Sequence, residues 1–329
     1  MIFYENNYTD PFLNLAAEEV LLRDTTLNEP VFLLWRNRPV VVVGRHQNTI
    51  EEINRRAVTE HDVRVVRRLT GGGAVYHDWG NLNYSFILPD NGIAFDFSRF
   101  SKPVIAALAR LGIKAKLSGR NDLEIDGRKC SGAAQARICG RLLHHGTLLF
   151  NTDLDMLSRV LNVLPAKIES KAVASVRARV TNIVDYLPVG VCSNIESFKH
   201  VVFDEIASAG AMTVKSFDDR TLEKIVTLRD KKYVTWDWNF GHSPPCNFRF
   251  FRRFDWGCVD VRLSVRHGII ESCCFYGDFF AGNEVDILTQ RMKGMRFDYS
   301  TAMSTLDDEL IRSVFPQWNL AGLCVLLFD

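Results

Sequence analysis

The sequence predicts an α+β fold with mixed or antiparallel sheets, flanking helices and a second, smaller α+β unit at the C-terminal end. Two observations support this prediction. Strand-like segments come in runs, whereas a parallel sheet would require them to alternate strictly with helices. The breaker-rich segment 240–245 separates the main part of the chain from three further strand-like segments. Because 329 residues suit one large domain and a smaller one, we expect domains at 1–243 and 246–329.

Helices are expected where caps precede apolar periodicity. Asp10-Pro11 opens an amphipathic helix, since proline is favoured at the first helical position. Asn48 and Glu51 fit a capping box, so one helix is expected to continue to about residue 60. Another is expected from about 103 to 111, helical segments should dominate 154–234, and two or three helices should end the chain.

Strands are expected where β-branched and aromatic residues cluster between turn residues. The pair Asp126-Gly127 favours a type I′ turn, which predicts a two-residue hairpin over 122–130. A three-stranded meander is expected near the C-terminus. In order, the expected strands are 3–8, 32–35, 40–43, 64–68, 82–88, 122–125, 128–130, 144–150, 248–254, 257–265 and 269–275.

Composition excludes several classes of protein. Forty basic and 39 acidic residues give a net charge of +1, so no overall field attracts the chain to nucleic acid or to an anionic membrane. No signal peptide or long apolar segment is visible, and we therefore expect a cytoplasmic protein. The eight cysteines form no C-x-x-C pair and no zinc spacing, which predicts free thiols in a reducing compartment.

The most informative segment is 67–78, where two arginines precede Gly71-Gly72-Gly73. Three glycines remove every Cβ from the loop, so backbone N–H groups can approach a bulky anion closely. The segment matches neither a Walker A motif nor a dinucleotide fingerprint. A glycine-rich turn of purely structural use remains the alternative at this point.

Three further segments carry candidate site residues. Gly44-Arg45-His46 ends an apolar strand, as residues at the edge of a pocket would. Asp122 could hold a magnesium ion or pair with an arginine, and it could also be only a turn residue. Lys129 is followed by small residues, which would leave space for a ligand beside a compact positive charge.

Two adjacent histidines, His144 and His145, should point to opposite faces of a strand, so that at most one reaches a given pocket. The chain thus combines a phosphate loop, arginines and a strand lysine with no activated nucleophile that has a convincing base. Such a set suits adenylate formation, in which a carboxylate attacks the α-phosphate of ATP while the protein aligns the groups and stabilises charge.

The order and spacing of these motifs resemble those of lipoate–protein ligase A, in the superfamily that also holds lipoyl and octanoyl transferases and biotin ligases. The resemblance covers nearly the whole chain, with 246–329 similar to that family's C-terminal accessory domain. The motifs that carry it lie at 44–48, 68–81, 118–122, 128–132, 144–148, 175–182 and 236–241.

The resemblance implies an enzyme that activates lipoate with ATP and Mg²⁺ to lipoyl-AMP, releasing pyrophosphate. It would then transfer the lipoyl group to one lysine of a carrier, either a lipoyl domain of a 2-oxoacid dehydrogenase acyltransferase subunit or the glycine-cleavage H protein. No permanently bound cofactor, nucleic acid or membrane is implied. The choice among lipoate, octanoate and shorter acyl groups stays open.

The family pattern also implies roles for individual residues. Lys129 would contact the lipoyl carboxylate and the α-phosphate in both half-reactions, and 175–182 would close over the adenylate. The residues implied to bind ATP and lipoyl-AMP are Arg68, Gly71, Gly72, Gly73, Ala74, Val75, Tyr76, Asn81, Asp122, Lys129, Ser175, Arg177, Arg179 and Val180, with Asp122 as the magnesium candidate. Those implied to bind lipoate are Gly44, Arg45, His46, Lys129, Gly132, His145 and Gly146.

One departure from the family leaves an alternative open. Cys130 stands beside Lys129 where the family more often has an apolar residue, and related transferases use a cysteine nucleophile without ATP. An ATP-independent lipoyl or octanoyl transferase using Cys130 or Cys139 is therefore the second hypothesis. We expect Cys130 to face away from Lys129, into the core. A lipoate-binding regulator without activity would require loss of Lys129 or of the glycine loop, and both are present.

Overall fold

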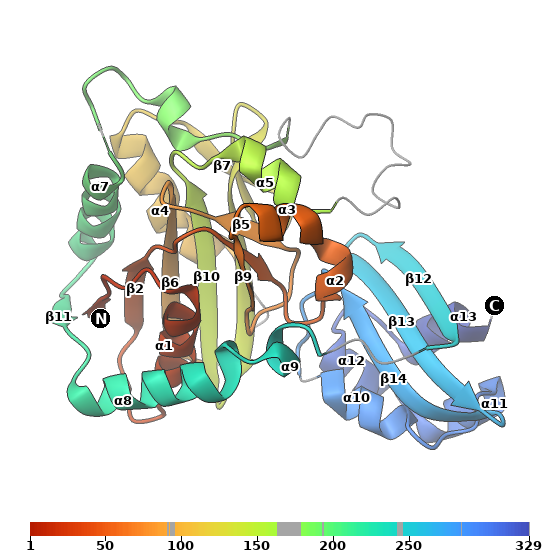
Figure 1. Ribbon diagram of the computed structural model, residues 1–329. Helices are drawn as coiled ribbons and strands as arrows, with labels where there is room; N and C mark the ends of the chain where they lie inside the picture. The colour runs from red at the N-terminus through yellow and green to blue at the C-terminus, as the bar shows by residue number, and fades with distance from the viewer. Residues whose placement is uncertain are drawn as a thin grey trace. The chain divides into compact units, whose positions relative to one another are not determined.

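The computed structural model describes residues 1–90, 92, 96–162, 179–192, 194–241, 246–283 and 285–328 (Figure 1). The chain packs as two compact units. The N-terminal unit comprises 1–43, 49–68 and 74–239, and the C-terminal unit comprises 44–48, 69–73 and 240–329. The glycine loop therefore packs with the C-terminal part of the chain, although its flanking strands belong to the N-terminal unit. No helix among the described residues is long and apolar enough to span a bilayer.

The N-terminal unit is built on a mixed eight-stranded sheet in the order β11-β1-β2-β6-β10-β9-β8-β7. β1 runs parallel to both of its neighbours, and the other pairs are antiparallel. The α+β class and the mixed sheet are thus confirmed. The strands are β1 (Ile2–Glu5), β2 (Val31–Trp35), β6 (Asn81–Pro89), β7 (Ala115–Ser118), β8 (Asp122–Ile125), β9 (Arg128–Ile138), β10 (Arg141–Leu149) and β11 (Thr213–Lys215).

A second sheet of three short strands carries the glycine loop. Its order is β4-β3-β5, with β4 parallel and β5 antiparallel to β3. The loop therefore joins two strands that are not hydrogen-bonded to each other, and a simple hairpin turn is excluded. The strands are β3 (Val40–Val43), β4 (Arg64–Arg67) and β5 (Val75–His77).

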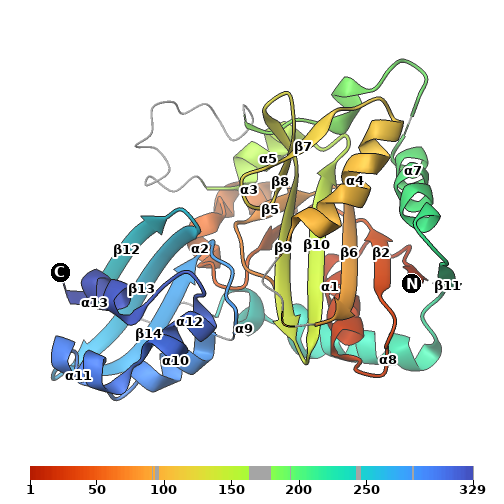
Figure 2. The same cartoon turned by 180° about the vertical axis from the view of Figure 1, so that it is seen from behind.

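Helices cover both faces of the large sheet (Figures 1 and 2). α4 and α7 pack against one face, where Phe86, Phe100 and Phe198 belong to a single apolar core. α1 contacts β6 and β10 from the other face. The N-terminal unit contains α1 (Pro11–Arg23), α2 (Thr49–Glu52), α3 (Arg55–Glu60), α4 (Ser98–Arg110), α5 (Leu154–Val160), a 3₁₀ turn (Ile183–Tyr186), α7 (Ile195–Ser208), α8 (Asp219–Leu228), a π-helical turn (Arg229–Tyr233) and α9 (Trp236–Asn239).

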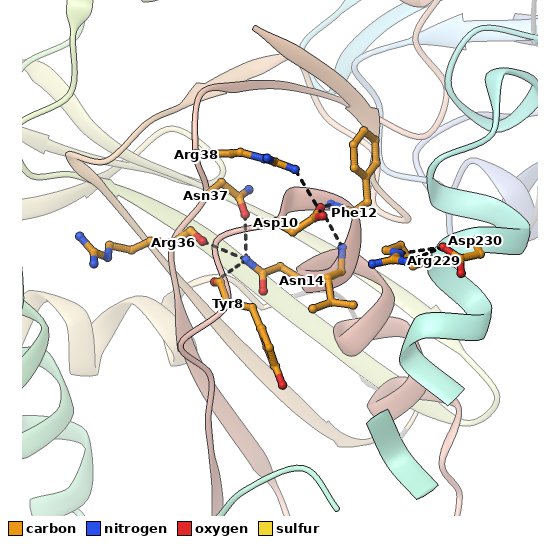
Figure 3. Close-up of polar contacts among 10 residues, drawn as sticks. Tyr8, Asp10, Phe12, Asn14, Arg36, Asn37, Arg38, Arg229 and Asp230 are labelled. Carbon is orange, nitrogen blue, oxygen red and sulfur yellow. Dashed lines mark hydrogen bonds and ion pairs between the residues drawn. The ribbon is translucent and has the colours of Figure 1, made fainter. Parts of the chain in front are cut away.

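The start of α1 is fixed by polar contacts (Figure 3). Asp10 is the N-cap, as predicted, and its Oδ1 accepts hydrogen bonds from the backbone N–H groups of Phe12 and Leu13. The Nδ2 of Asn14 lies 2.9 Å from both the Arg36 carbonyl and Asn37 Oδ1. These contacts tie α1 to the end of β2, and so place the helix against the sheet.

Two helix predictions need correction. The single helix expected from Asn48 to Glu60 is two short helices, because the side chain of Asn54 accepts from the Ala57 N–H and caps a new helix there. α4 begins at Ser98, five residues before Pro103. The strand β11 interrupts the region expected to be helical, and 163–178 lie outside the described residues.

The predicted hairpin turn is confirmed. Asp126 and Gly127 have φ of 50° and 78°, as a type I′ turn requires at both central positions. This turn joins β8 to β9 and so places Lys129 next to β8.

The C-terminal unit contains the predicted meander, formed by β12 (Phe248–Phe254), β13 (Gly257–Arg266) and β14 (Ile269–Gly277). Four helices follow among the described residues, where two or three were expected. They are α10 (Val285–Met292), α11 (Tyr299–Thr305), α12 (Asp308–Val314) and α13 (Leu320–Phe328). They share a core with one sheet face, which includes Val261, Leu288, Phe315 and Leu323.

A fully buried arginine holds the end of the N-terminal unit. Arg67 Nη2 donates to Thr49 Oγ1 at 2.7 Å, and Arg67 Nε donates to the Trp238 carbonyl at 2.9 Å. The Asn239 Oδ1 accepts from the Arg67 N–H at 2.8 Å. Arg67 therefore serves the fold, by fixing α9 to β4.

Candidate functional site

Lys129 and Asp122 form an ion pair on neighbouring strands. Lys129 Nζ lies 2.8 Å from Asp122 Oδ1, and both side chains are about one-third exposed. Asp122 thus pairs with a lysine, where the sequence had suggested magnesium or an arginine. Exposed ion pairs contribute little stability. Lys129 can therefore leave Asp122 and bind an incoming anion at a low cost in free energy.

A β-bulge decides which face of the sheet Lys129 uses. Leu123 lies opposite Ser131, but Glu124 lies opposite Lys129, so Cys130 is an extra residue in β9. Without it, alternation would place Lys129 on the face of Ser131 and the apolar core. The bulge turns Lys129 to the other face, together with Asp122 and Gly132.

Gly132 makes room for the lysine itself. A Cβ at Gly132 would lie 2.8 Å from Lys129 Nζ and 2.9 Å from its Cε. The small residues after Lys129 were expected to leave open space for a ligand. At Gly132 that space holds the lysine side chain, which lies across the glycine toward Asp122.

The segment after 178 runs beside Lys129. The Thr181 N–H donates to the Lys129 carbonyl at 2.8 Å, and Arg128 Nη2 donates to the Val180 carbonyl at 2.8 Å. Val180 is therefore next to the lysine strand, and Arg179 precedes it with an exposed side chain. Ser175 and Arg177 lie outside the described residues.

The two adjacent histidines face opposite sides of β10, as predicted. His144 stacks on Phe100 at 4.4 Å between ring centroids, and its Nδ1 lies 2.8 Å from Gln135 Nε2. Burial lowers the pKa of His144 well below its usual value, so the ring is neutral. His145 lies on the face of Lys129, where Ala134 is its β9 neighbour.

Sequence reasoning missed a buried carboxylate that holds His145. Glu18 of α1 is 2% exposed, and its Oε1 lies 3.0 Å from His145 Nδ1. The Ser85 hydroxyl donates to the same oxygen at 2.5 Å, and Trp35 Nε1 donates to Ser85 Oγ at 2.8 Å. The available signal was an acidic residue three positions after buried Leu15, on the apolar stripe of α1.

Arg68 is buried and close enough to Glu18 to feel its charge. Its Nη1 donates to the Val42 carbonyl at 3.1 Å. Burial lowers the pKa of Arg68 to about 10, and the Glu18 carboxylate opposes that shift. The guanidinium is still charged at neutral pH. It also contributes, after burial, to lowering the pKa of His77 to about 3.

Three other predicted site residues are constrained by burial, hydrogen bonding or close packing in the fold. Asn81 is buried and its Nδ2 donates to Asn83 Oδ1 at 3.0 Å. Tyr76 is 3% exposed, and burial raises its pKa. Gly146 lies on the core face of the sheet, where a Cβ would overlap the Tyr84 hydroxyl. Gly146 is therefore explained by packing, on the face opposite Lys129.

The glycine loop has two kinds of glycine. Gly72 has φ of 88°, and its N–H donates to the Phe279 carbonyl at 3.3 Å. A Cβ at Gly71 would overlap that same carbonyl oxygen, whereas a Cβ at Gly73 would meet nothing within 4 Å. The structural explanation therefore holds for Gly71, and Gly73 is the glycine that packing does not require.

The segment 44–48 belongs to the C-terminal unit with the loop. The Arg45 N–H donates to the Thr70 carbonyl at 2.8 Å, and the His46 ring stacks on Phe279 at 4.9 Å. Gly44 N–H donates to Gln47 Oε1 at 2.8 Å. The predicted site residues are thus divided between the units. Lys129, Asp122, Gly132 and His145 share one sheet face of the N-terminal unit, and Gly44, Arg45, His46 and Gly71–Gly73 pack in the C-terminal unit.

Neither candidate cysteine forms a couple with a histidine in the described part of the chain. Cys130 is fully buried, and its Sγ lies 3.4 Å from the Leu123 carbonyl. Burial raises the pKa of this thiol to about 12, so it stays protonated near neutrality. Cys139 is exposed in the β9–β10 turn, where its Sγ lies 3.7 Å from Arg23 Nη1.

The described residues include no cluster of three or more His, Cys, Asp or Glu side chains that could hold a metal. Two carboxylates of β8 lie beside Lys129: Asp122, which forms the ion pair, and Glu124, its cross-strand neighbour. Mg²⁺ often needs only one or two protein carboxylates when phosphates supply other ligands. Asp122 fits that limited role if Lys129 moves to another partner.

Comparisons with known proteins agree with this fold and with its two-part organisation. Residues 10–207 match the family model for the lipoyl protein ligase A/B catalytic domain, and 243–327 match the model for the bacterial lipoate protein ligase C-terminus. Lipoate–protein ligase 1 of Staphylococcus aureus is 42% identical over 304 residues, which cover 92% of each chain. Lipoate-protein ligase LplJ of Bacillus subtilis is 40% identical over 320 residues, which cover 96% of each.

Solved structures give the same result over the main part of the chain. Lipoate–protein ligase A bound with ATP has a TM-score of 0.62 and 27% identity, covering 73% of this chain and 99% of that one. A bipartite lipoate protein ligase of Thermoplasma acidophilum, studied with its E2 lipoyl domain, has a TM-score of 0.65 and 29% identity. It covers 75% of this chain and 98% of that one.

Proposed function

Because the chain belongs to the family of lipoyl protein ligase A/B catalytic domains, we propose that it is an ATP-dependent lipoate–protein ligase. In the first half-reaction a lipoate carboxylate oxygen attacks the α-phosphorus of ATP, and the bond to the bridging oxygen breaks to release pyrophosphate. In the second, a carrier lysine amine attacks the acyl carbonyl, loses a proton and displaces AMP. The supporting observation is the Lys129–Asp122 pair, on a sheet face shared with His145.

Lys129 has the chemistry that the first step needs. Negative charge gathers on the α-phosphate and the attacking carboxylate, and a fixed ammonium lowers the energy of that arrangement. Asp122 holds the ammonium in place at 2.8 Å before substrate arrives. Val180, beside the lysine strand, would border the adenylate. The remaining nucleotide contacts that we propose are made by Arg68, Gly73, Ala74, Val75, Tyr76, Asn81, Ser175, Arg177 and Arg179.

Lipoate would occupy the same sheet face. The buried Glu18–His145 pair offers a fixed polar group there, and Gly132 and Lys129 lie across the next strand. We keep Gly44, Arg45 and His46 as lipoate-binding candidates from the family pattern. Mg²⁺ would arrive with ATP, held mainly by its phosphates, with Asp122 as the protein carboxylate.

The acceptors we propose are lipoyl domains of 2-oxoacid dehydrogenase acyltransferase subunits and the glycine-cleavage H protein. The support is the archaeal relative, which was studied with an E2 lipoyl domain. We further propose that the enzyme is cytoplasmic and that its domains divide at 1–243 and 246–329. Segments 44–48 and 69–73 would then be parts of the first domain that pack with the second.

The test is lipoate-dependent exchange of labelled pyrophosphate into ATP by the purified protein. Exchange requires reversible formation of lipoyl-AMP and needs no acceptor. We expect exchange with lipoate and none without it. Lipoyl transfer from a thioester donor in the absence of ATP, with no exchange, would contradict the proposal and favour the transferase.

Cys130→Ser distinguishes the ATP-dependent ligase from the cysteine-dependent transferase, because it replaces only the sulfur atom that the transferase would use as its nucleophile. We expect this variant to retain at least about half of its ATP-dependent ligation, because the thiol is buried, protonated and on the core side of the bulge. The matched variant is Cys139→Ser, at the exposed cysteine. Ligation assays with both variants are the measurement, and an acyl-thioester trapped at either position would reverse this expectation.

A further inference from the structure

A row of five positions crosses the large sheet on the face of Lys129. Each residue of the row lies directly opposite the next, from β2 through β6, β10 and β9 to β8. Directly opposed residues point to the same face of a sheet, so all five share the face that carries the Lys129–Asp122 pair. In order, the row consists of Trp35, Asn83, Thr147, Gly132 and Asp122.

Exposure falls along this row from the end beside Lys129 toward its interior. Lys129 and Asp122 are each 34% exposed, and Thr147 is half-buried. Asn83, which follows Thr147 in the row, is only 1% exposed. It lies two strands from Gly132, so their Cα atoms are about 10 Å apart at the usual spacing of strands. Asn83 therefore lies at the inner end of the row, and Lys129 lies at the open end.

The Asn83 side chain carries a buried hydrogen-bond donor that has no acceptor. Its Oδ1 accepts from Asn81 Nδ2 at 3.0 Å. Its Nδ2 is also buried and has no hydrogen-bond partner among the described residues. By contrast, its neighbour Trp35 is satisfied, since Trp35 Nε1 donates to Ser85 Oγ. A buried donor without an acceptor is destabilising, and such a group indicates that an acceptor is supplied from elsewhere.

We propose that Asn83 Nδ2 binds the carboxylate of the acyl substrate, an inference that rests on the proposed ligase function. One carboxylate oxygen would face the Lys129 ammonium, and the other would face the Asn83 amide, with the group lying over Thr147. A carboxylate with one donor on each side spans about 8 Å, which fits between residues whose Cα atoms are about 10 Å apart. The oxygen beside Lys129 would attack the α-phosphorus while Asn83 holds the other.

The same hydrogen bond would serve the transfer step. The oxygen held by Asn83 becomes the acyl carbonyl oxygen of lipoyl-AMP. When the carrier amine attacks the acyl carbon, this oxygen gains negative charge until the bond to AMP breaks and the amine loses its proton. A preorganised N–H group aimed at that oxygen stabilises the charge as it develops. Asn83 would therefore act in both half-reactions.

The competing explanation is that Asn83 is structural and donates to an ordered water molecule. In that case, replacing its amide would change stability and would affect every ligand of the site alike. A direct contact makes a different prediction. The effect would then depend on whether the ligand presents an oxygen or an NH2 group to position 83.

The experiment titrates lipoate and its neutral amide, lipoamide, by calorimetry in the absence of ATP. Asn83→Asp keeps the oxygen that accepts from Asn81 and replaces the Nδ2 donor with a second carboxylate oxygen. We expect this variant to bind lipoate about 30-fold more weakly, because a hydrogen bond to a charged group is lost and two carboxylates repel. Lipoamide can donate its NH2 group to the new carboxylate, and should bind this variant at least as well as it binds the wild type.

A second variant tests the transfer step and does not introduce a charge. Asn83→Leu has a similar volume and removes both polar atoms of the amide. We expect it to bind lipoate about ten-fold more weakly. It should also slow transfer from preformed lipoyl-AMP to an apo lipoyl domain about ten-fold or more, because the stabilised oxygen gains charge in that step.

The matched control is Asn6→Leu, at a buried asparagine that has partners for both ends of its amide. Asn6 Nδ2 donates to Asn14 Oδ1 at 3.1 Å, and its Oδ1 accepts from the Tyr8 N–H at 3.0 Å. This variant should be less stable and should bind lipoate normally at temperatures where it is folded. An equal loss of lipoate affinity in the control would mean that any lost buried amide disturbs the site.

Three further results would overturn the role of Asn83. They are lipoate affinity within two-fold of wild type in a folded Asn83 variant, an equal loss of lipoate and lipoamide binding in Asn83→Asp, and failure of both variants to fold in thermal denaturation. Failure of pyrophosphate exchange by the wild-type protein would instead count against the ligase itself. The contrast between lipoate and lipoamide would still report on Asn83, because it is measured without ATP.

Discussion

Replacing Lys129 with alanine should lower lipoate-dependent pyrophosphate exchange by about 10²–10³-fold, which is the usual cost of removing one preorganised group that stabilises charge in a transition state. The loss should fall mainly on the rate, because the ammonium acts on charge that develops as the carboxylate attacks phosphorus. Lys129→Met should have a similar effect, since it keeps the side-chain volume across Gly132 and removes only the charge.

The fold should tolerate both changes. The Lys129–Asp122 pair is about one-third exposed on each side, and such pairs contribute at most about 1 kcal/mol of stability. Lys116→Ala is the matched control, because Lys116 is an exposed lysine of β7 in the same sheet. Exchange rates and thermal denaturation of the three variants are the measurements. Near-normal exchange by a folded Lys129→Met enzyme would remove Lys129 from the mechanism.

Local chemistry was sufficient to predict much of the fold. Asp10-Pro11 and Asp126-Gly127 act within four residues, through a cap and a turn that other parts of the chain do not alter. The meander after residue 246 was also found as expected, because three strands with short turns depend on neighbours in sequence. Asn54 shows the limit of this reasoning. The capping pattern at Asn48 predicted one helix up to about residue 60, but Asn54 caps a second helix and so divides the predicted one.

The candidate site was only partly predictable, for a geometric reason. Alternation from Lys129 to its neighbour correctly predicted Cys130 in the core, but the same alternation counted from buried Ser131 would put Lys129 on the core face too. The extra residue Cys130 reverses that placement, and a period of two cannot reveal a bulge. Glu18 was missed because its partners His145 and Ser85 are 127 and 67 residues away in the chain. No short-range pattern reports such a contact.

The glycine loop shows how one motif can serve two requirements. In sequence its three glycines are equivalent, and the anion-binding loop is favoured over a structural turn for all three alike. Phe279, more than 200 residues later, makes Gly71 a packing residue and engages the N–H of Gly72. A Cβ at Gly73 would meet nothing within 4 Å, so close approach of an anion can be tested at Gly73 apart from packing.

Gly71→Ala and Gly73→Ala should therefore fail in different assays. At Gly71 the new methyl group would overlap the backbone oxygen of Phe279, which cannot rotate away. We expect the free energy of unfolding to fall by about 2–3 kcal/mol, as overpacking typically costs. At Gly73 the methyl group meets nothing within 4 Å, so stability should change by less than about 0.5 kcal/mol.

In activity assays we expect the reverse: Gly73→Ala should be impaired and Gly71→Ala should not. If the backbone at Gly73 approaches the phosphates of ATP, a methyl group there should raise the KM for ATP about ten-fold or more, by obstructing a close contact. The KM for lipoate should change little, and Gly71→Ala should bind ATP normally at temperatures where it is folded. Thermal denaturation and pyrophosphate exchange at varied ATP concentrations measure both effects. A stable Gly73→Ala enzyme with an unchanged KM for ATP would mean that this loop serves packing alone, and the phosphate site would then have to be sought among Arg68 and the residues around Lys129.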